Sequence, residues 1–496
     1  MNRTPDRTAL VDPITDRRFS YAEVETRVEE FAAGLRAFGI ERGDRVGTAL
    51  SNTPEHVFVL LAVQHVGAVA VPFDYRVSDE KLEHFVADAD LSMLVFGEQI
   101  AEQVLDRRED LEFGALVTTA DILANGVEPC DVLRRETSDE VPSPARPDDP
   151  SVVQYTSGTT GDPKGIEISH RSGVDRALLN VHSQDKFDAE TVLGTIPLYH
   201  TIAFHGNLLS TFATGGTYVL LQHSHVDEAG EVIAREGVTL IHEAPPILKK
   251  LVGLDDETGE TAADPATFAS VETVASAAAP MGDELFAAIK RVIDPEYLYN
   301  TYGMTEIFPP YTKVNLRDRD DQRLFGYATP TDAMRIVEID SLDPTATVEP
   351  GEEGELIVRR DTAGAFDRYL HNYEGTEDAF QGEWYFTGDA CVETDDGHYA
   401  VTGRLHDRIK FGGDNIYPKN VEAVLAAHSA VEETTVVGID HDEWGEVPKA
   451  YVVADTDVTA DELEQHCVEN DTLEDYKRPR EFEFVTSLEV IEAVET

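Results

Sequence analysis

The segment YTSGTTGDPKG, from Tyr155 to Gly165, is the stretch that decides how this sequence of 496 residues is interpreted. It combines three glycines, four serine or threonine residues and Lys164 in one short loop. Backbone N–H groups and hydroxyls in such a loop can surround phosphate oxygens. The loop lacks the GxxxxGK[ST] spacing of the common nucleotide-binding fold. A flexible surface loop is the alternative, but it would not require a lysine and Pro163 among so many hydroxyls.

The sequence on both sides of this loop predicts an α/β fold. Ser20 and Glu23 form a capping-box pattern, and apolar residues then recur at helical spacing as far as Gly39. Farther along, short apolar runs alternate with helical patterns, as expected for mainly buried strands packed on helices. These runs lie at residues 69–73, 92–96, 217–221, 238–241 and 271–275.

A second, smaller domain is predicted near the C-terminus. After residue 405 the pattern changes to a helix at 420–427, strands at 434–438, 450–454 and 481–485, and a helix capped by Thr459 and Glu462. We therefore predict domains at residues 1–405 and 406–496. The Pro-, Asp- and Ser-rich segment 136–149 is expected to be an exposed connection.

The charge balance restricts the partners. The chain has 96 Asp and Glu residues against 40 Lys and Arg, which gives a formal net charge of -56. Such a surface repels nucleic acid and anionic membranes. Because the acidic residues are spread along the chain, we expect adaptation to a salty, halophilic cytoplasm, where salt screens the repulsion. A role in binding acidic ligands or storing cations is the alternative.

Cysteine usage and hydropathy predict a soluble, cytoplasmic protein. Cys130, Cys391 and Cys467 lie far apart without metal-ligand spacing and are expected to be buried thiols. The first 16 residues lack the apolar core of a signal peptide. The longest apolar stretch, 57–72, is interrupted by polar residues and is too short to span a membrane.

Six further motifs occur together with the loop. They are PLYH (197–200), ASAAAP (275–280), YGMTE (302–306), GELIVR (354–359), WYFTGD (384–389) and GRLHDRIKFGGDNIYP (403–418). In order and spacing the chain resembles the adenylate-forming superfamily of acyl-CoA synthetases, luciferases and peptide-synthetase adenylation domains. The resemblance implies a large N-terminal domain of stacked mixed sheets and helices and a small mobile α+β domain. It also implies a two-step reaction, in which a carboxylate attacks the α-phosphate of ATP and a thiol then takes the acyl group from acyl-AMP.

The resemblance implies roles for individual residues around ATP. Thr305 would contact the α-phosphate, Glu306 would bind Mg²⁺, and Tyr302 would stack on adenine. Asp389, with Arg404 beside it, would accept hydrogen bonds from the ribose hydroxyls. Taken alone, Glu306 would be a solvated acid and Asp389 a turn residue. The remaining nucleotide-binding residues implied by the resemblance are Thr156, Ser157, Gly158, Thr159, Thr160, Gly161, Lys164, Ala277, Ala278 and Gly303.

Other implied roles concern the acid and the thiol. His200 matches a position that lines the acyl pocket in relatives and is assigned with Lys164, Thr305 and Glu306 to catalysis, although His205 competes with it. The backbone of Gly412 and Gly413 would line the CoA tunnel, where side chains leave no room. His406 stands at the pivot between the domains, where relatives carry Asp or Lys; a plain surface histidine is the alternative.

One departure from the family lies at the C-terminus. The pattern from Tyr476 to Leu488 fits the relatives, whose later lysine bridges the carboxylate and the α-phosphate. Here Glu495 occupies that position. We therefore predict an AMP-forming acyl-CoA synthetase for fatty or aryl acids, using ATP, Mg²⁺ and CoA, as a monomer or homodimer, with weak adenylation. The alternatives are a free-standing adenylation enzyme that loads a carrier protein and a non-catalytic relative that binds nucleotide or acyl-AMP.

Overall fold

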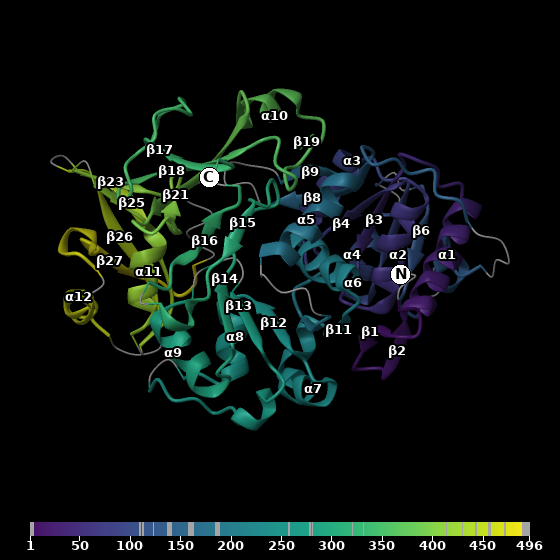
Figure 1. The fold of residues 1–496 in the computed structure, drawn as a ribbon, viewed down its shortest axis with the longest axis horizontal. Coiled ribbons are helices and arrows are strands. Elements are labelled where there is room, and N and C mark those ends of the chain that lie inside the picture. The colour runs from purple at the N-terminus through teal and green to yellow at the C-terminus, as the bar shows by residue number, and fades with distance from the viewer. Residues whose placement is uncertain are drawn as a thin grey trace. The chain divides into compact units, whose positions relative to one another are not determined.

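A computed structural model shows that the chain forms two compact units, each built from several stretches of sequence (Figure 1). Unit 1 comprises Met1–Leu251, Ala263–Met334 and Arg359–Tyr385, and unit 2 comprises Val252–Ala262, Arg335–Val358 and Phe386–Thr496. The structure describes residues 4–488 except 109–110, 112–113, 123, 136–140, 157–162, 184–188, 256–257, 277–278, 280, 320, 331, 413, 429, 442–443, 455–457 and 471–472. The domain boundary after residue 405 stays a prediction.

The first sheet of unit 1 carries the two strands that flank the phosphate loop. Its order is β19 (Arg368–Tyr369), β9 (Lys164–Ser169), β8 (Pro150–Thr156), β4 (Val69–Pro72), β3 (Arg45–Ala49), β5 (Met93–Phe96), β6 (Leu116–Thr118) and β7 (Val127–Pro129). Strands β4, β3, β5, β6 and β7 pair in parallel, whereas β8 pairs antiparallel with β9. The loop therefore connects two hydrogen-bonded antiparallel neighbours, which fixes both of its ends.

The second sheet of unit 1 is also mostly parallel. Its order is β14 (Tyr297–Asn300), β13 (Thr273–Ser276), β12 (Leu240–Glu243), β10 (Thr191–Gly194), β11 (Thr217–Leu220), β1 (Thr8–Asp12) and β2 (Arg17–Ser20). The expected apolar runs are confirmed as strands, but β12 and β13 each begin two residues later than predicted. The N–H of Val238 bonds to the carbonyl of Ile233 in the preceding helix, and the N–H of Val271 bonds to the carbonyl of Phe268 in the preceding 3₁₀ turn, so both residues belong to the turns before the strands.

Helices complete unit 1, and the predicted first helix is confirmed. Ser20 and Glu23 form the reciprocal capping box of α1, which ends at Ala37. The helices are α1 (Tyr21–Ala37), α2 (Pro54–His65), α3 (Asp79–Ala89), α4 (Ala101–Arg107), α5 (His170–Ser183), α6 (Ser210–Thr214), α7 (Ala229–Glu236), α8 (Pro245–Val252), α9 (Asp283–Val292), α10 (Tyr373–Ala379) and the π-helix Ile202–Leu209. Short 3₁₀ turns lie at Glu98–Ile100, Cys130–Leu133, His223–Glu228, Pro265–Phe268 and Leu316–Asp318.

Strand β15 (Tyr311–Lys313) pairs antiparallel with β16 (Leu324–Ala328), and the short β20 (Phe380–Gln381) follows α10.

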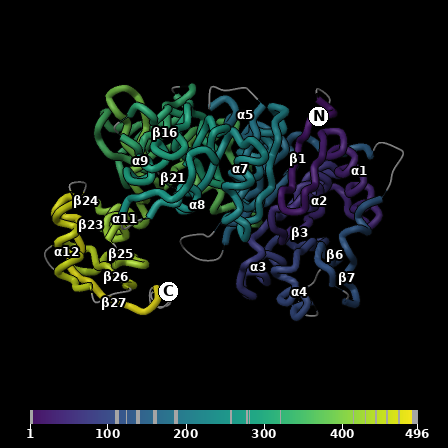
Figure 2. Tube along the Cα trace, turned by 90° about the horizontal axis from the view of Figure 1, so that it is seen from below, coloured from purple at the N-terminus to yellow at the C-terminus, as the bar shows by residue number. Residues whose placement is uncertain are grey.

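Unit 2 contains the predicted small α+β fold at its C-terminal end, shown in yellow in Figure 2. Its strands are β23 (Ile409–Phe411), β24 (Asp414–Ile416), β25 (Val431–His441), β26 (Gly445–Ala454) and β27 (Glu481–Phe484), with helices α11 (Pro418–Ala426) and α12 (Ala460–Glu469) and a 3₁₀ turn at Asp475–Lys477. The capping box of Thr459 and Glu462 is confirmed at the start of α12. The other strands of unit 2 are β17 (Met334–Val337), β18 (Glu353–Arg359), β21 (Trp384–Glu393) and β22 (Tyr399–Arg404).

The three cysteines are buried and unbonded, as predicted. No helix in the described part of the chain is long and apolar enough to cross a membrane.

Most of the acidic residues remain in contact with water. Among the described residues, only five carboxylate side chains belong to buried residues, namely Asp12, Glu167, Glu243, Glu355 and Asp389. Repulsion among the exposed carboxylates acts over the screening length of the solution, which is ~30 Å at 0.01 M salt and ~3 Å at 1 M. We therefore expect the thermal unfolding midpoint to rise steeply between low and molar KCl. A midpoint that does not change over this range would contradict the proposed adaptation to salt.

Candidate functional site

In unit 1 the structure brings both Lys164 and Glu306 next to one aromatic side chain, that of Tyr369. Lys164 begins β9, and its Nζ lies 5.3 Å from the centre of the Tyr369 ring. The Tyr369 hydroxyl donates a hydrogen bond to Glu306 Oε1 at 3.3 Å. Because β19 pairs antiparallel with β9, residue 369 is held next to the strand that starts with Lys164. A cation, a phenol and a carboxylate therefore form one cluster.

Tyr369 was not predicted. It comes from a stretch with several aromatic residues, and no spacing in that stretch distinguishes it. Burial and the charge of Glu306 raise the pKa of Tyr369, so its hydroxyl stays protonated and available as a donor. Thr156 pairs with Lys164 across β8 and β9. The other predicted phosphate-loop residues, Ser157, Gly158, Thr159, Thr160 and Gly161, lie outside the described residues, as do Ala277 and Ala278.

The YGMTE segment follows β14 and is held by aromatic packing. The Tyr302 ring stacks on Phe325 with 4.7 Å between ring centres. The Tyr311 hydroxyl accepts from the Tyr302 N–H at 2.8 Å and donates to the Tyr302 carbonyl at 3.0 Å. The chain at Tyr302, which is predicted to meet adenine, is therefore fixed in place.

A buried arginine supports the other end of this segment. Arg176 on α5 is fully buried and donates to the main-chain carbonyl of Glu306 at 3.3 Å and to Thr201 Oγ1 at 3.1 Å. Its guanidinium also lies 5.1 Å from the Phe308 ring centre. Burial lowers the pKa of Arg176 to about 9, against the attraction of Asp367 and Glu306. Sequence reasoning missed this residue, since an arginine in a helix is usually exposed.

A pocket of about 180 Å³ in unit 1 is bordered by this segment. Its lining includes Leu179, Asn180, Ser183, His200, Thr201, Ile202, Thr301, Tyr302, Gly303, Met304, Thr305, Phe308, Pro309, Tyr311 and Lys313. The structure therefore places Gly303, Thr305 and His200 around one space. Loss of hydration lowers the pKa of His200, so its imidazole is neutral at pH 7.

The two candidate histidines have different environments. His205 is fully buried, and its Nδ1 lies 3.1 Å from Thr201 Oγ1. It is absent from the pocket lining, which contains His200. The arrangement favours His200 over His205 as the residue that faces a bound acid.

In unit 2 the structure brings Asp389 and Arg404 together. The two residues pair across β21 and β22, and Arg404 Nε lies 2.8 Å from Asp389 Oδ1. Asp389 is only 3% exposed, so the arginine partly compensates the cost of burying its charge. The N–H of Asp389 donates to Thr387 Oγ1 at 3.1 Å, which fixes the chain at the TGD motif.

The remaining predicted residues of unit 2 are more exposed. His406 lies in a turn, and its side chain is 62% exposed. Gly412 has a φ of +59°, and a Cβ there would lie 2.9 Å from the Trp444 ring. Only glycine is accommodated at this position without strain. Gly413 and Glu495 lie outside the described residues.

Known protein families match most of the chain. The family model described as AMP-binding enzyme matches residues 1–370, and the AMP-binding enzyme C-terminal domain matches residues 420–492. A 4-chlorobenzoate–CoA ligase from Arthrobacter sp is 30% identical over 490 residues, which is 98% of this chain and 90% of the relative. The long-chain-fatty-acid–CoA ligase FadD13 of Mycobacterium tuberculosis is 28% identical over 98% of this chain and 93% of its own length.

A solved structure shares the whole fold. The crystal structure of the anthranilate CoA ligase AuaEII in complex with anthranoyl-AMP matches with a TM-score of 0.83 and 25% identity, covering 98% of this chain and 92% of that one. The family matches extend over both the phosphate-loop sheet and the small α+β fold. The chain therefore belongs to the AMP-binding enzyme family and is an acid–thiol ligase of its acyl-CoA synthetase branch.

Proposed function

We propose that the chain joins a small carboxylic acid, aryl or short-chain, to CoA through an acyl-AMP intermediate, with release of AMP and pyrophosphate. The pocket of about 180 Å³ beside the YGMTE segment carries this proposal. An apolar protein cavity of about 150 Å³ holds benzene. The pocket therefore suits an acyl group of about one ring, and the Phe308 and Tyr302 side chains in its lining suit an aromatic one.

The names of the relatives agree with an acid of this class. The Arthrobacter relative is named for 4-chlorobenzoate, and the AuaEII structure holds anthranoyl-AMP. FadD13 is named for long-chain fatty acids, so fatty acids remain the competing substrates. The pocket volume favours the aryl class.

The cluster in unit 1 supports the first half-reaction. Both reactants are anions, so the site must hold them in line and neutralise charge at the phosphates. Lys164 supplies a cation beside the phosphate loop, and we assign the α-phosphate contact to Thr305. Glu306 fits a magnesium site, since Mg²⁺ is often held by one or two carboxylates together with substrate phosphates. When bound there, Mg²⁺ would supply positive charge to the phosphate oxygens, while the Tyr369 hydroxyl orients the carboxylate.

Groups in unit 2 are suited to bind the nucleotide and to admit the thiol. Asp389 would accept hydrogen bonds from the ribose hydroxyls, with its carboxylate oriented by Arg404. The bare backbone at Gly412 is suited to close approach of the pantetheine arm of CoA. We assign His406 as the pivot that changes its backbone angles between the half-reactions, because it lies in an exposed turn.

Two other activities remain as alternatives. The acceptor thiol could belong to a carrier protein in place of CoA. The glutamate at position 495, where relatives have a lysine, favours slow adenylation and, at the limit, a relative that only binds nucleotide or acyl-AMP.

The decisive experiment follows the products of ATP. In molar KCl with Mg²⁺ and CoA, the purified protein should release AMP and pyrophosphate in the presence of benzoate-sized acids and should form the acyl-CoA thioester. Octanoate and palmitate serve as comparison acids. Release of ADP and inorganic phosphate would contradict the proposal. Acylation of a carrier-protein thiol but not of CoA would select the first alternative.

A further inference from the structure

A lysine in the pocket plays no part in the chemistry described above. Lys313 ends β15 and is only 7% exposed, yet it borders the same pocket as His200 and Thr305. Its Nζ donates to Asn180 Oδ1 at 3.1 Å and lies 6.0 Å from the centre of the Tyr299 ring. No carboxylate forms an ion pair with Lys313 among the residues that the structure describes. A buried ammonium group therefore faces the pocket with a single neutral acceptor.

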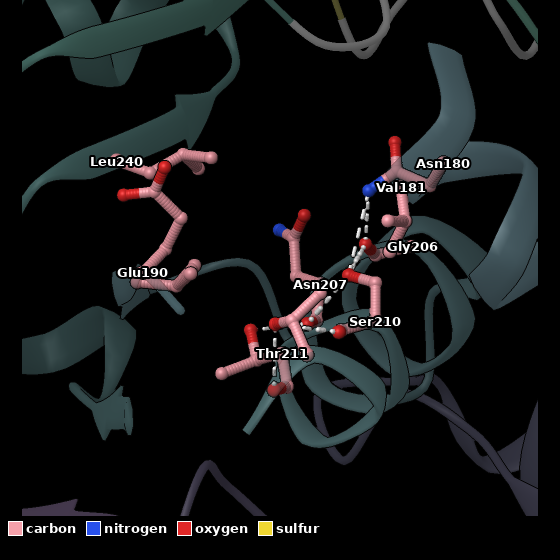
Figure 3. A pocket seen from close by; sticks show the side chains of 10 residues that line it. Asn180, Val181, Glu190, Gly206, Asn207, Ser210, Thr211 and Leu240 are labelled. Atoms are coloured by element: carbon pink, nitrogen blue, oxygen red, sulfur yellow. Dashed lines mark hydrogen bonds between the residues drawn. The ribbon is translucent and has the colours of Figure 1, made fainter. Parts of the chain in front are cut away.

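The partner of this lysine is itself fixed. Asn180 lies on α5, and its Nδ2 donates to the Gly206 carbonyl and to Ser210 Oγ, the latter at 3.4 Å (Figure 3). Because its amide nitrogen is used in this way, its oxygen is the atom presented to Lys313. The asparagine thus positions the ammonium group but contributes no negative charge.

The neighbouring polar groups do not supply the missing charge either. His242 on β12 bonds through Nδ1 to Asn207 Oδ1 and through Nε2 to Thr301 Oγ1, both at 2.9 Å. Burial lowers the pKa of Lys313 to about 7 and that of His242 to about 3. An ammonium group has three donors, and a buried one without a counter-charge is costly.

We propose that Lys313 binds a second carboxylate of the substrate, so that the acid activated is a small dicarboxylic acid. This inference rests on the proposed function and specifies its substrate class. An acid that fills the pocket contacts both Thr305, where the reactive carboxylate is expected, and Lys313. The second carboxylate supplies the counter-charge that the described part of the chain lacks, and a charge-assisted hydrogen bond is stronger than a neutral one. An acid with a single carboxylate leaves the buried ammonium group unpaired.

The test compares matched acids. For the wild type, we expect a higher kcat/KM for AMP release with phthalate, isophthalate or terephthalate than with benzoate, or with glutarate than with butanoate. Lys313→Met should lower kcat/KM for the preferred diacid by about 10²-fold and leave the monoacid within a few-fold, because a hydrogen bond to a charged group is lost only with the diacid. Lys419→Met is the matched control, since Lys419 is exposed on α11.

The variant is expected to fold. Burying a charge without a counter-charge is costly, and methionine removes that charge while keeping a side chain of similar length. The thermal unfolding midpoint of Lys313→Met should therefore equal or exceed that of the wild type.

The pH dependence of the wild type gives a test that needs no substitution. The protonated lysine binds the second carboxylate, so KM for the diacid should rise above pH 7, by about tenfold for each pH unit, while KM for the monoacid stays flat. The other titratable groups in the pocket lining are His200, Tyr302 and Tyr311, and His242 and Tyr299 lie near Lys313. The pKa values of both histidines are lowered and that of Tyr311 is raised, so these three stay neutral between pH 7 and 9.

The outcomes separate this inference from the proposed function. Equal losses with diacid and monoacid in Lys313→Met would overturn the inference, as would a wild-type preference for benzoate or for 3-hydroxybenzoate, whose second group is an uncharged hydroxyl. In those cases AMP release still supports the proposed function. No AMP release with any acid would overturn both.

Discussion

Glu306→Gln should lower acid-dependent AMP release by about 10²–10³-fold, the range typical for removing one group that stabilises developing charge in a transition state. The substitution keeps the size of the side chain and its contact with the Tyr369 hydroxyl. It removes the negative charge of the carboxylate, which we propose binds Mg²⁺. The measurement is steady-state AMP release at several Mg²⁺ concentrations, with thermal unfolding as a check on folding.

Two control variants test whether the loss of rate comes from the charge of Glu306 itself. Tyr369→Phe removes only the hydroxyl and should reduce the rate much less. Glu296→Gln removes an exposed carboxylate after α9 and should have no effect. A Glu306→Gln enzyme that retains the wild-type rate and Mg²⁺ dependence would show that the metal is held elsewhere.

Glu495→Lys should raise acid-dependent pyrophosphate exchange by about 10²-fold, if position 495 takes the place of the lysine that the family resemblance implies between the two anions. Thioester formation from supplied acyl-AMP does not bring these anions together, so the substitution should leave that half-reaction unchanged. Measuring both half-reactions on the wild type and the variant tests the assignment. Glu495→Gln, which removes the negative charge without adding a positive one, should give a smaller increase.

Lys477 is the lysine nearest to position 495 in the sequence and is the rival candidate for the missing cation. Its Nζ lies 2.7 Å from Glu474 Oε2, so its charge already has a partner. If wild-type exchange is already fast and Lys477→Ala abolishes it, Lys477 supplies the cation and our assignment is wrong. If Glu495→Lys has no effect and Lys477→Ala leaves exchange unchanged, position 495 does not reach the reacting groups.

Local sequence signals predicted much of the fold. The capping boxes at Ser20 and Thr459 are confirmed because each depends on residues three positions apart. The apolar runs became strands for a similar reason, since burial of a whole strand needs only consecutive apolar side chains. The family motifs identified the enzyme class because several occur in a fixed order.

Contacts between distant segments were harder to predict. Arg176 and Glu306 are 130 positions apart, and Lys313 and Asn180 are 133 apart. Each side chain is ordinary in its own segment and becomes unusual only when folding buries it. Lys313, one of 11 lysines, follows the segment IFPPYT (307–312), which carries no motif. Tyr369 is likewise selected by the pairing of β19 with β9, which no local pattern specifies.

The packing around Tyr302 has an entropic consequence. Its ring already lies against Phe325, and both its main-chain N–H and carbonyl are tied to the Tyr311 hydroxyl. Ordering a mobile side chain on binding costs about 0.5–1.5 kcal/mol. Tyr302 loses that rotational freedom when the protein folds, before any ligand binds. A base that stacks on Tyr302 would therefore add a third ring to the stacked pair of Tyr302 and Phe325. If Tyr302 stacks on adenine as predicted, the free energy of that stacking would contribute to nucleotide affinity with little loss of conformational entropy at this residue.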